Sequence, residues 1–117
     1  MESVLEGSRQ SYYAAVLVFE SSSDEVNYQP LYEEEVLIVE APSEDAARER
    51  AIQLGKERET SYKNQDGQTI SNQFKRLLDV QAIQDGQIEH GSTVYSRHFR
   101  DYAAYETFEP LLEGQPL

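Results

Sequence analysis

The sequence predicts an α+β fold, with a four-stranded antiparallel sheet in β-β-α-β-β order and one helix, at about residues 43–59, packed on one face. Three observations predict it. Runs of β-branched and aromatic residues precede residue 42, a capped stripe of small apolar residues follows it, and alternating segments fill much of the second half. The expected single domain covers residues 11–100.

The first two strands are expected at Ser11–Glu20 and Leu31–Ala41. In the first strand, apolar residues occupy both alternating sets of positions, which is typical of a strand that lies centrally or is covered on both faces. The second strand opens with acidic residues and ends in the run Val36–Val39, which the pattern predicts to be buried.

The helix is expected to begin at Ser43, whose hydroxyl suits the capping position. Glu44 and Asp45 follow in the first turn, where the helix dipole favours negative charge. A narrow stripe at helical spacing then allows close packing on a sheet. The stripe consists of Ala47, Ala51, Leu54, Gly55, Arg58 and Tyr62.

After a turn at residues 64–67, two further strands are expected, at about Thr69–Ile83 and Ser92–Arg100. Residues 1–10 are predicted to be a flexible tail. Residues 101–117 form a C-terminal tail whose aromatic side chains predict that it docks back on the body of the domain.

One helix cannot cover a sheet whose central strand is apolar on both faces. The second face must therefore meet the C-terminal tail, another copy of the chain or a partner. Self-association through this face makes a homodimer the expected assembly.

Charge narrows the class of partner. The chain has 22 acidic residues against 10 Lys and Arg, a net charge of -12, and residues 1–60 alone carry fourteen acidic and five basic residues. This charge repels nucleic acid and anionic membranes and attracts basic proteins. We therefore expect no nucleic-acid or membrane partner, and we expect any macromolecular partner to be basic.

The absence of cysteine excludes disulfides, a thiolate nucleophile and cysteine metal ligands, and it is consistent with the cytoplasmic location that we predict. The N-terminus lacks the basic and apolar regions of a secretion signal. No apolar stretch approaches the roughly 20 residues that a membrane-spanning helix needs.

Three tracts carry a family resemblance: Tyr-Glu-Glu-Glu-Val-Leu-Ile-Val-Glu-Ala at residues 32–41, Glu-Asp-Ala-Ala-Arg-Glu-Arg-Ala at 44–51, and Val-Tyr-Ser-Arg-His-Phe at 94–99. Over about residues 12–100 the chain resembles a small bacterial family of stand-alone domains of unknown function. The resemblance implies a compact bacterial domain, and it brings no activity, cofactor or site residue with it.

The candidate partner-binding residues are Glu33, Glu34 and Glu35. On a strand, the first and third share a face and the second takes the other. Two carboxylates on one face can divide acid and base roles, but three in a row also serve as a charged edge strand that discourages aggregation. Binding of a partner is the preferred functional interpretation over catalysis.

The candidate ligand-binding residues are Tyr62, Tyr95 and Arg97, which we expect around a pocket between sheet and helix. His90 and His98 are the only histidines, and their spacing matches no zinc motif. Ser96 and His98 share a strand face, but no nucleophile elbow accompanies them. We expect no metal and no cofactor.

These observations predict a non-enzymatic binding module. Its preferred role is protein–protein interaction, as an acidic immunity-like or inhibitor protein that covers a basic partner. The alternative is a small-ligand-binding domain with a pocket between sheet and helix. An enzyme that uses Glu33, Glu35 or His98 is the least favoured interpretation.

Overall fold

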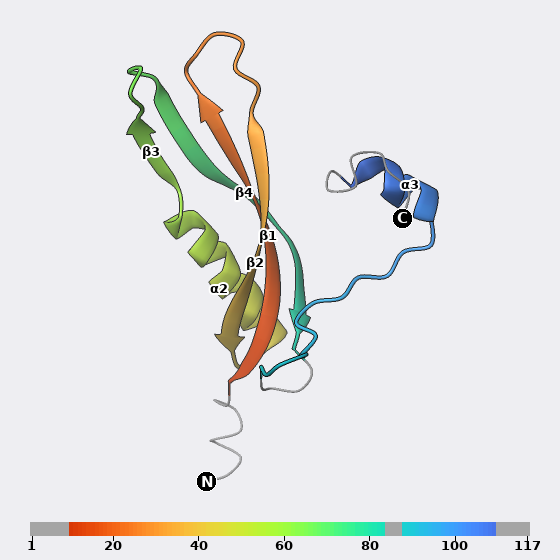
Figure 1. Ribbon diagram of the computed structural model, residues 1–117. Coiled ribbons are helices and arrows are strands. Elements are labelled where there is room, and N and C mark those ends of the chain that lie inside the picture. Colours follow the sequence, from red (N-terminus) through yellow and green to blue (C-terminus); the bar gives the residue numbers. More distant parts are fainter. Residues whose placement is uncertain (1–9, 84–87, 110–117) are drawn as a thin grey trace.

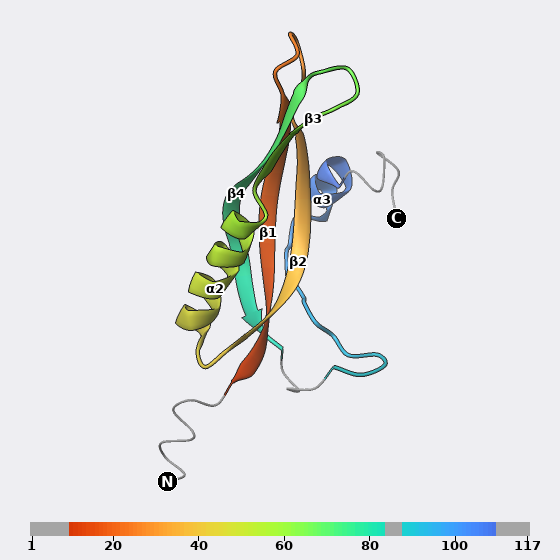
Figure 2. The same cartoon turned by 90° about the vertical axis from the view of Figure 1, so that its left-hand side faces the viewer.

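The computed structural model describes residues 10–83 and 88–109, which form an α+β fold around one four-stranded antiparallel sheet (Figure 1). Helix α2 (Glu44–Glu57) lies on one side of the sheet and helix α3 (Tyr102–Phe108) on the other (Figure 2). The predicted α+β class is confirmed, with a second helix added. The strands, in the spatial order β2-β1-β4-β3, are β1 (Ser11–Ser23), β2 (Leu31–Ala41), β3 (Thr60–Lys63) and β4 (Thr69–Ala82).

One predicted strand is wrong. Residues Ser92–Arg100 are extended but pair with no strand in the described part of the chain. The fourth strand is instead β3, a stretch that the helical stripe had been expected to reach. Asn64 explains the fold at this point, because its side-chain oxygen accepts hydrogen bonds from the backbone N–H groups of Asp66 and Gln68. Gly67, at a φ of 80°, completes the turn that folds β4 back on β3.

β1 occupies the centre of the sheet, one of the two placements expected from its apolar residues on both faces. It pairs with β2 over eleven consecutive residue pairs without a break. Its pairing with β4 shifts register after Val16 and after Val18, where β4 carries the extra residues Leu78 and Lys75. Such bulges bend a strand and increase its twist, so the sheet curls around α2.

Helix α2 begins as the sequence predicted. The hydroxyl of Ser43 accepts a hydrogen bond of 3.1 Å from the backbone N–H of Ala46. Glu44 and Asp45 lie in the first turn and Lys56 in the last, which is the arrangement that the helix dipole favours. The cap and the charges fix where the helix starts, and therefore which of its residues face the sheet.

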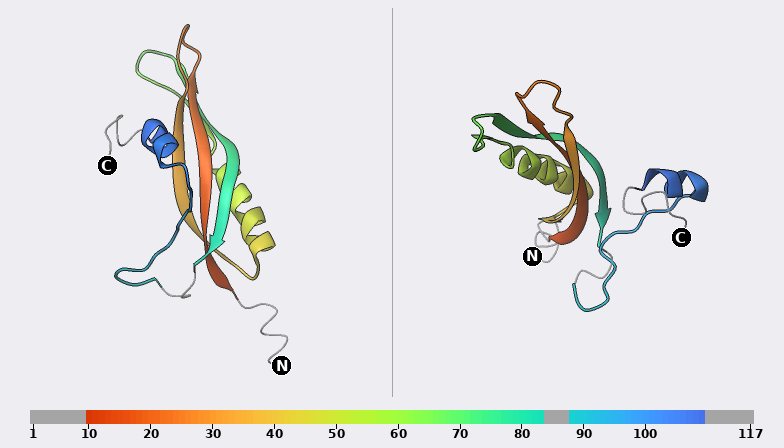
Figure 3. Two further views of the ribbon diagram at one scale, coloured as in Figure 1. Left: turned by 90° about the vertical axis from the view of Figure 1, so that its right-hand side faces the viewer. Right: turned by 45° about the horizontal axis from the view of Figure 1, so that its top comes forward.

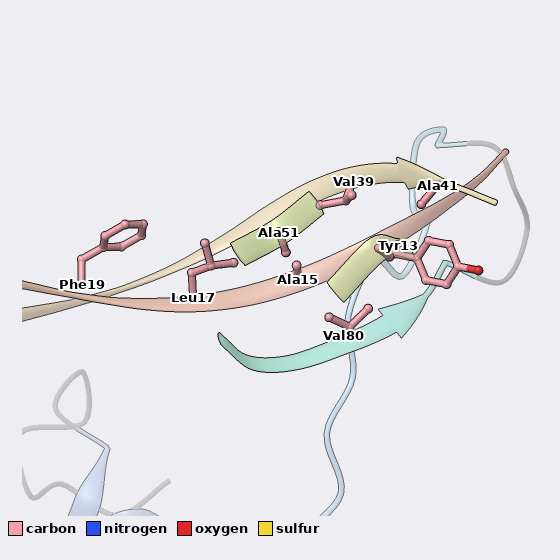
Figure 4. Packing of buried hydrophobic residues seen from close by; sticks show 9 residues of the cluster. Tyr13, Ala15, Leu17, Phe19, Val39, Ala41, Ala51 and Val80 are labelled. Carbon is pink, nitrogen blue, oxygen red and sulfur yellow. The ribbon is translucent and has the colours of Figure 1, made fainter. Parts of the chain in front are cut away.

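The hydrophobic core lies between α2 and one face of the sheet (Figure 4). Leu17 of β1 is fully buried at its centre, and the ring of Phe19 packs edge-on against that of Phe74. The buried positions of α2 are small, namely Ala47, Ala51 and Gly55, so the helix approaches the sheet closely. The remaining core residues are Tyr13, Ala15, Val39, Ala41 and Val80.

The opposite face of the sheet is crossed by residues 88–109, here called the C-terminal arm (Figure 3, left). Ala14 and Val16, on this face of β1, are 0% and 2% exposed. The arm contacts the sheet through its extended part, while no residue of α3 is buried. The hydrogen bonds to the sheet come from residues 95 and 96, before the tail at 101–117 that was expected to dock, so docking of that tail stays a prediction, and part of the face is left open.

Three predicted stretches fall wholly or partly outside the described residues. They are the flexible tail at residues 1–10, of which only Gln10 is described, the loop around residue 85, and the end of the C-terminal tail beyond residue 109.

Candidate interaction site at the edge of the sheet

β2 forms one edge of the sheet, since it pairs with β1 on one side and with no strand among the described residues on the other. It contains neither Gly nor Pro, and its ladder with β1 has no bulge. Proteins usually protect such edges with prolines, bulges or charges. Here only the charges are present, in the form of the consecutive residues Glu33, Glu34 and Glu35.

The three glutamates lie side by side on β2 and point to alternate faces. Glu35 stands opposite Leu17 and shares the α2 side of the sheet with Glu33. It forms an ion pair with Arg58, the C-cap residue of α2. Glu33 and Glu34 are exposed. Two of the three predicted carboxylates are thus presented to solvent, and the third is engaged within the fold.

Two apolar side chains of β2 are exposed next to these carboxylates. Val36 and Ile38 are 50% and 51% exposed, on the face away from α2. The prediction that the whole run Val36–Val39 is buried is therefore wrong for alternate residues. The physical reason is the edge position of β2. Helix α2 covers Leu37 and Val39 on one face, but nothing described covers their neighbours fully on the other.

The arm is tied to the sheet by two side chains of β4. The side-chain amide of Gln81 donates to the carbonyl of Ser96 at 2.6 Å and accepts from its backbone N–H at 3.3 Å. The carboxylate of Asp79 accepts a hydrogen bond of 2.9 Å from the hydroxyl of Tyr95. These bonds replace the strand ladder that the sequence predicted for this segment.

The hydrogen bonds of Gln81 with Ser96 and of Asp79 with Tyr95, here called the tie, are insensitive to pH near neutrality. Burial raises the pKa of Asp79, but hydrogen bonds from Tyr95, Gln81 and the Val80 N–H favour the charged form and bring the pKa below its ordinary value of 3.8. The stabilisation from charged Asp79 is therefore fully present when the pH is above the ordinary pKa, and it is lost as the pH falls through the lower pKa of the folded state. Burial, then the bond to Asp79, raises the pKa of Tyr95 above 10.0, so its contribution is lost only as pH rises through that raised value.

Replacing Gln81 with alanine should loosen the arm without unfolding the sheet. The variant loses both hydrogen bonds to Ser96, which we expect to cost about 1–3 kcal/mol of local stability. Amide hydrogen exchange at Ser96 should accelerate. Gln73→Ala, an exposed residue of the same strand, is the control that should leave this exchange unchanged. Equal exchange rates in Gln81→Ala and wild type would show that the tie does not hold the arm.

A cavity of about 270 Å³ lies between the arm and the β2 side of the sheet. It presents one carboxylate and one guanidinium, from Glu34 and Arg97, beside the rings of Phe99 and Tyr105, which stack with centroids 4.6 Å apart. Charged groups of both signs beside aromatic rings can hold a small polar molecule or the side chain of a partner. The remaining lining residues are Val16, Val36, Tyr95 and Ser96.

The structure brings together two of the three predicted ligand-binding residues. Tyr95 and Arg97 line this cavity, on the face opposite α2. Tyr62 of β3 pairs with Ile70 of β4, which is level with Ser23 of β1, whereas Tyr95 bonds to Asp79 of β4, which is level with Val16. Seven residues of strand separate the two places, or about 23 Å at 3.3 Å per residue. The three residues do not share a pocket between sheet and helix.

Sequence reasoning missed several residues of the site. It did not identify Asp79 and Gln81 as the groups that hold the arm, and it gave Phe99 and Tyr105 no role in a cavity. The one available signal was that Asp79 and Gln81 lie on the same face of β4, next to the apolar strand β1. No signal in the sequence indicated that Val36 and Ile38 are exposed, because their exposure depends on which strand lies at the edge of the sheet.

The enzymatic candidates are spread over the molecule. Glu33 and Glu35 share a face of β2, and Arg58 occupies the carboxylate of the second. His98 lies in the arm and lines a cavity of about 460 Å³ beside α3, which adjoins the first cavity and shares Arg97, Phe99 and Tyr105 with it. In residues 10–83 and 88–109, no group of three or more His, Cys, Asp or Glu is placed to hold a metal ion. No helix in the same residues is long and apolar enough to cross a membrane.

Comparison with known proteins identifies the family of the chain. No curated protein and no solved structure matches it. A family model with the description "Domain of unknown function (DUF4288)" matches residues 12–96, which run from the start of β1 to the residue that Gln81 holds. Over these residues, which include β2 and the tie of the arm, the chain belongs to the DUF4288 family.

Proposed function

We propose that the chain is a non-enzymatic protein-interaction module that binds a basic partner through the edge strand β2, in the manner of an immunity or inhibitor protein. The proposal places this interaction in the cytoplasm, in keeping with the absence of cysteine. The observation that carries it is the combination on one free edge of two exposed carboxylates, Glu33 and Glu34, with two half-exposed apolar residues, Val36 and Ile38.

Charge and apolar surface have different tasks in such an interface. The net charge of -12 steers a basic protein toward the chain and raises the rate of encounter. The apolar side chains are then buried, which holds the complex together. A surface that was only solubilising would need the carboxylates but not Val36 and Ile38 beside them.

Charge reversal of the edge tests this proposal, once a partner has been isolated by affinity capture from the native host. Glu33→Lys with Glu34→Lys should slow association about tenfold or more and change dissociation less. Glu35 is left intact because of its ion pair with Arg58. Wild-type association should also slow steeply with salt, because the Debye length falls from about 10 Å at 0.1 M to about 3 Å at 1 M.

The matched control for this experiment makes the same change in net charge at two residues outside β2. Glu25→Lys with Glu49→Lys reverses two exposed carboxylates in the β1–β2 loop and on α2. This variant should retain most of the wild-type association rate. An acidic partner, or an association rate that the β2 reversal leaves unchanged, would overturn the proposal.

A small-ligand-binding domain is the second candidate, favoured by the cavity between arm and sheet. Arg97 is the residue best placed there to bind an anionic group. A metabolite screen by thermal shift, run on wild type and on Arg97→Ala, separates the two proposals. A compound that stabilises wild type but not an equally stable Arg97→Ala variant would place this function ahead of protein binding.

Self-association remains a prediction of the sequence, and we propose a homodimer through the open part of the face away from α2. Val36, Ile38 and Phe99 are each about half exposed there. Light scattering at micromolar concentration should report a mass twice that of the 13.4 kDa chain. A monomer at every accessible concentration would leave the face to a different protein.

A further inference from the structure

We infer that the partner contributes an extended segment that pairs with the free edge of β2 as a fifth strand, with basic residues opposite the glutamates and apolar residues opposite Val36 and Ile38. This inference rests on the proposed function, which names the class of partner, and it adds the mode of binding. It is carried by the backbone of β2 as well as by its side chains.

The outward-facing backbone groups of β2 are fixed by the pairing of β1 with its other neighbour, β4. The carbonyl of Tyr12, in β1, accepts a hydrogen bond from the N–H of Ile83 and so points toward β4. Its partner Glu40 therefore makes no ladder bonds with β1. Consistent with this, the carbonyl of Glu40 accepts a hydrogen bond from the side chain of Arg50. Glu40 thus directs its N–H and C=O away from the sheet.

The regular ladder extends this result along the strand. Outward-facing residues alternate with inward-facing ones in an antiparallel pair, and no bulge interrupts β1 and β2. The N–H and C=O groups of Tyr32, Glu34, Val36 and Ile38 therefore face outward too. Arg50 contacts this edge at Glu40, and among the described residues no strand pairs with it at residues 31–38. The length left open, residues 31–38, suits an added strand of about seven residues.

The side chains of β2 determine which residues an added strand needs. An added strand places its side chains beside those of β2, with directly opposed Cβ atoms about 4.5–5.5 Å apart. Lys or Arg opposite Glu33 and Glu34 gains opposite charge on both faces of the sheet. Valine, isoleucine or threonine opposite Val36 and Ile38 covers apolar surface that is now half exposed. The chemistry therefore selects a segment that is basic at one end and apolar at the other.

Charge also decides between a basic partner and a second copy of β2. Two β2 strands paired antiparallel over their full length place each run of three glutamates opposite residues 37–39 of the other copy. Eight carboxylates, four from each copy with Glu40 included, then share one ladder, and the pairing brings no cation to any of them. A basic segment along residues 31–38 gives both exposed carboxylates of that stretch, Glu33 and Glu34, a partner of opposite charge.

The test uses a peptide with the sequence Val-Thr-Ile-Lys-Lys-Lys-Thr, blocked at both ends and titrated into the full chain. Residue-resolved hydrogen exchange is the readout. We expect the amides of Glu34, Val36 and Ile38 to become protected when the peptide binds. Those of the intervening residues Leu37 and Glu35 are bonded to β1 already and should not change. This alternation distinguishes strand addition from charge attraction alone.

N-methylation gives a second readout on the peptide itself. Methyl groups on one alternating set of its amides remove the donors that face β2, while methyl groups on the other set remove outward donors. We expect one methylated peptide to bind at least about tenfold more weakly than the parent and the other to bind as the parent does. A matched pair of protein variants complements it. Val36→Pro removes an outward donor that an edge strand can lose, and Val36→Ala removes only the side chain, so the first should bind more weakly.

Each outcome decides a different point. If both methylated peptides bind as the parent does, or if the parent peptide does not bind, the inference is wrong, while the proposed function is still judged by its charge-reversal experiment. If a peptide with glutamate in place of lysine binds better than the parent, both fail. If the alternating protection already exists without peptide and grows with protein concentration, the occupant is a second copy and the inference is wrong.

Discussion

Replacing Leu17 with alanine is expected to lower the free energy of unfolding by about 3–5 kcal/mol. Leu17 is 0% exposed and is the largest fully buried side chain among the described residues. It lies on the central strand, which is held by β2 on one side and β4 on the other. The backbone therefore cannot collapse into the cavity that alanine leaves. Because domains of this size are stable by about 5–15 kcal/mol, urea melts should detect a large loss.

Val36→Ala is the control for this measurement. Val36 lies at the neighbouring edge and is half exposed, so its truncation should cost less than about 1 kcal/mol. Equal losses in the two variants would contradict the placement of the core on the α2 face of the sheet.

Gly55→Ala should destabilise the protein by up to about 2 kcal/mol, although alanine is the better helix former. A Cβ at this position would lie 2.6 Å from Cδ1 of Phe74 and 3.0 Å from Cδ2 of Leu17. Overpacking of this kind costs about 1–3 kcal/mol, whereas the higher helix propensity of alanine returns about 1 kcal/mol. Thermal unfolding of the variant and of wild type measures the difference.

A double-mutant cycle identifies the contact responsible. In a Phe74→Leu background the ring is absent, and Gly55→Ala should become neutral or stabilising. If the alanine costs as much in that background as in wild type, the clash with Phe74 is not its cause, and the helix would have to lie farther from the sheet.

Local chemistry allowed the helix and the centre of the sheet to be predicted. Ser43 caps α2 because its hydroxyl accepts a hydrogen bond from the Ala46 N–H, which has no partner within the helix, and both groups lie within three residues of each other. β1 was expected at the centre of the sheet because a strand that is apolar on both faces has to be shielded from water on both, and it lies between β2 and β4. In both cases the decisive interactions lie close together in the sequence or follow from composition alone.

The strands beyond the helix depended on partners that are distant in sequence. Tyr95, Arg97 and Phe99 alternate as in a strand, and their backbone is indeed extended, but the groups that hold it are side chains of β4. No periodicity distinguishes a side-chain partner from a backbone partner. β3 was missed because Thr60–Lys63 is too short for an alternating pattern and has Tyr62 as its only large apolar residue.

The candidate site was half predictable for the same reason. The cost of burying unpaired carboxylates places Glu33 and Glu34 at the surface whatever the topology. The exposure of Val36 and Ile38 requires that β2 lie at the edge, which follows only from the pairing of β1 with β4. The division of Tyr62 from Tyr95 follows from the same long-range register.

The bond between Gln81 and the backbone of Ser96 has a consequence for sequence tolerance. A glutamine side chain carries the same donor and acceptor as a peptide group, so it holds residue 96 by atoms that nearly every amino acid possesses. Any residue except proline can occupy position 96 and keep these two hydrogen bonds, whereas few side chains other than glutamine at position 81 can form both of them. A random library at position 96 should therefore yield folded chains of nearly every type, and the arm can acquire new surface chemistry there while its path over the sheet stays the same.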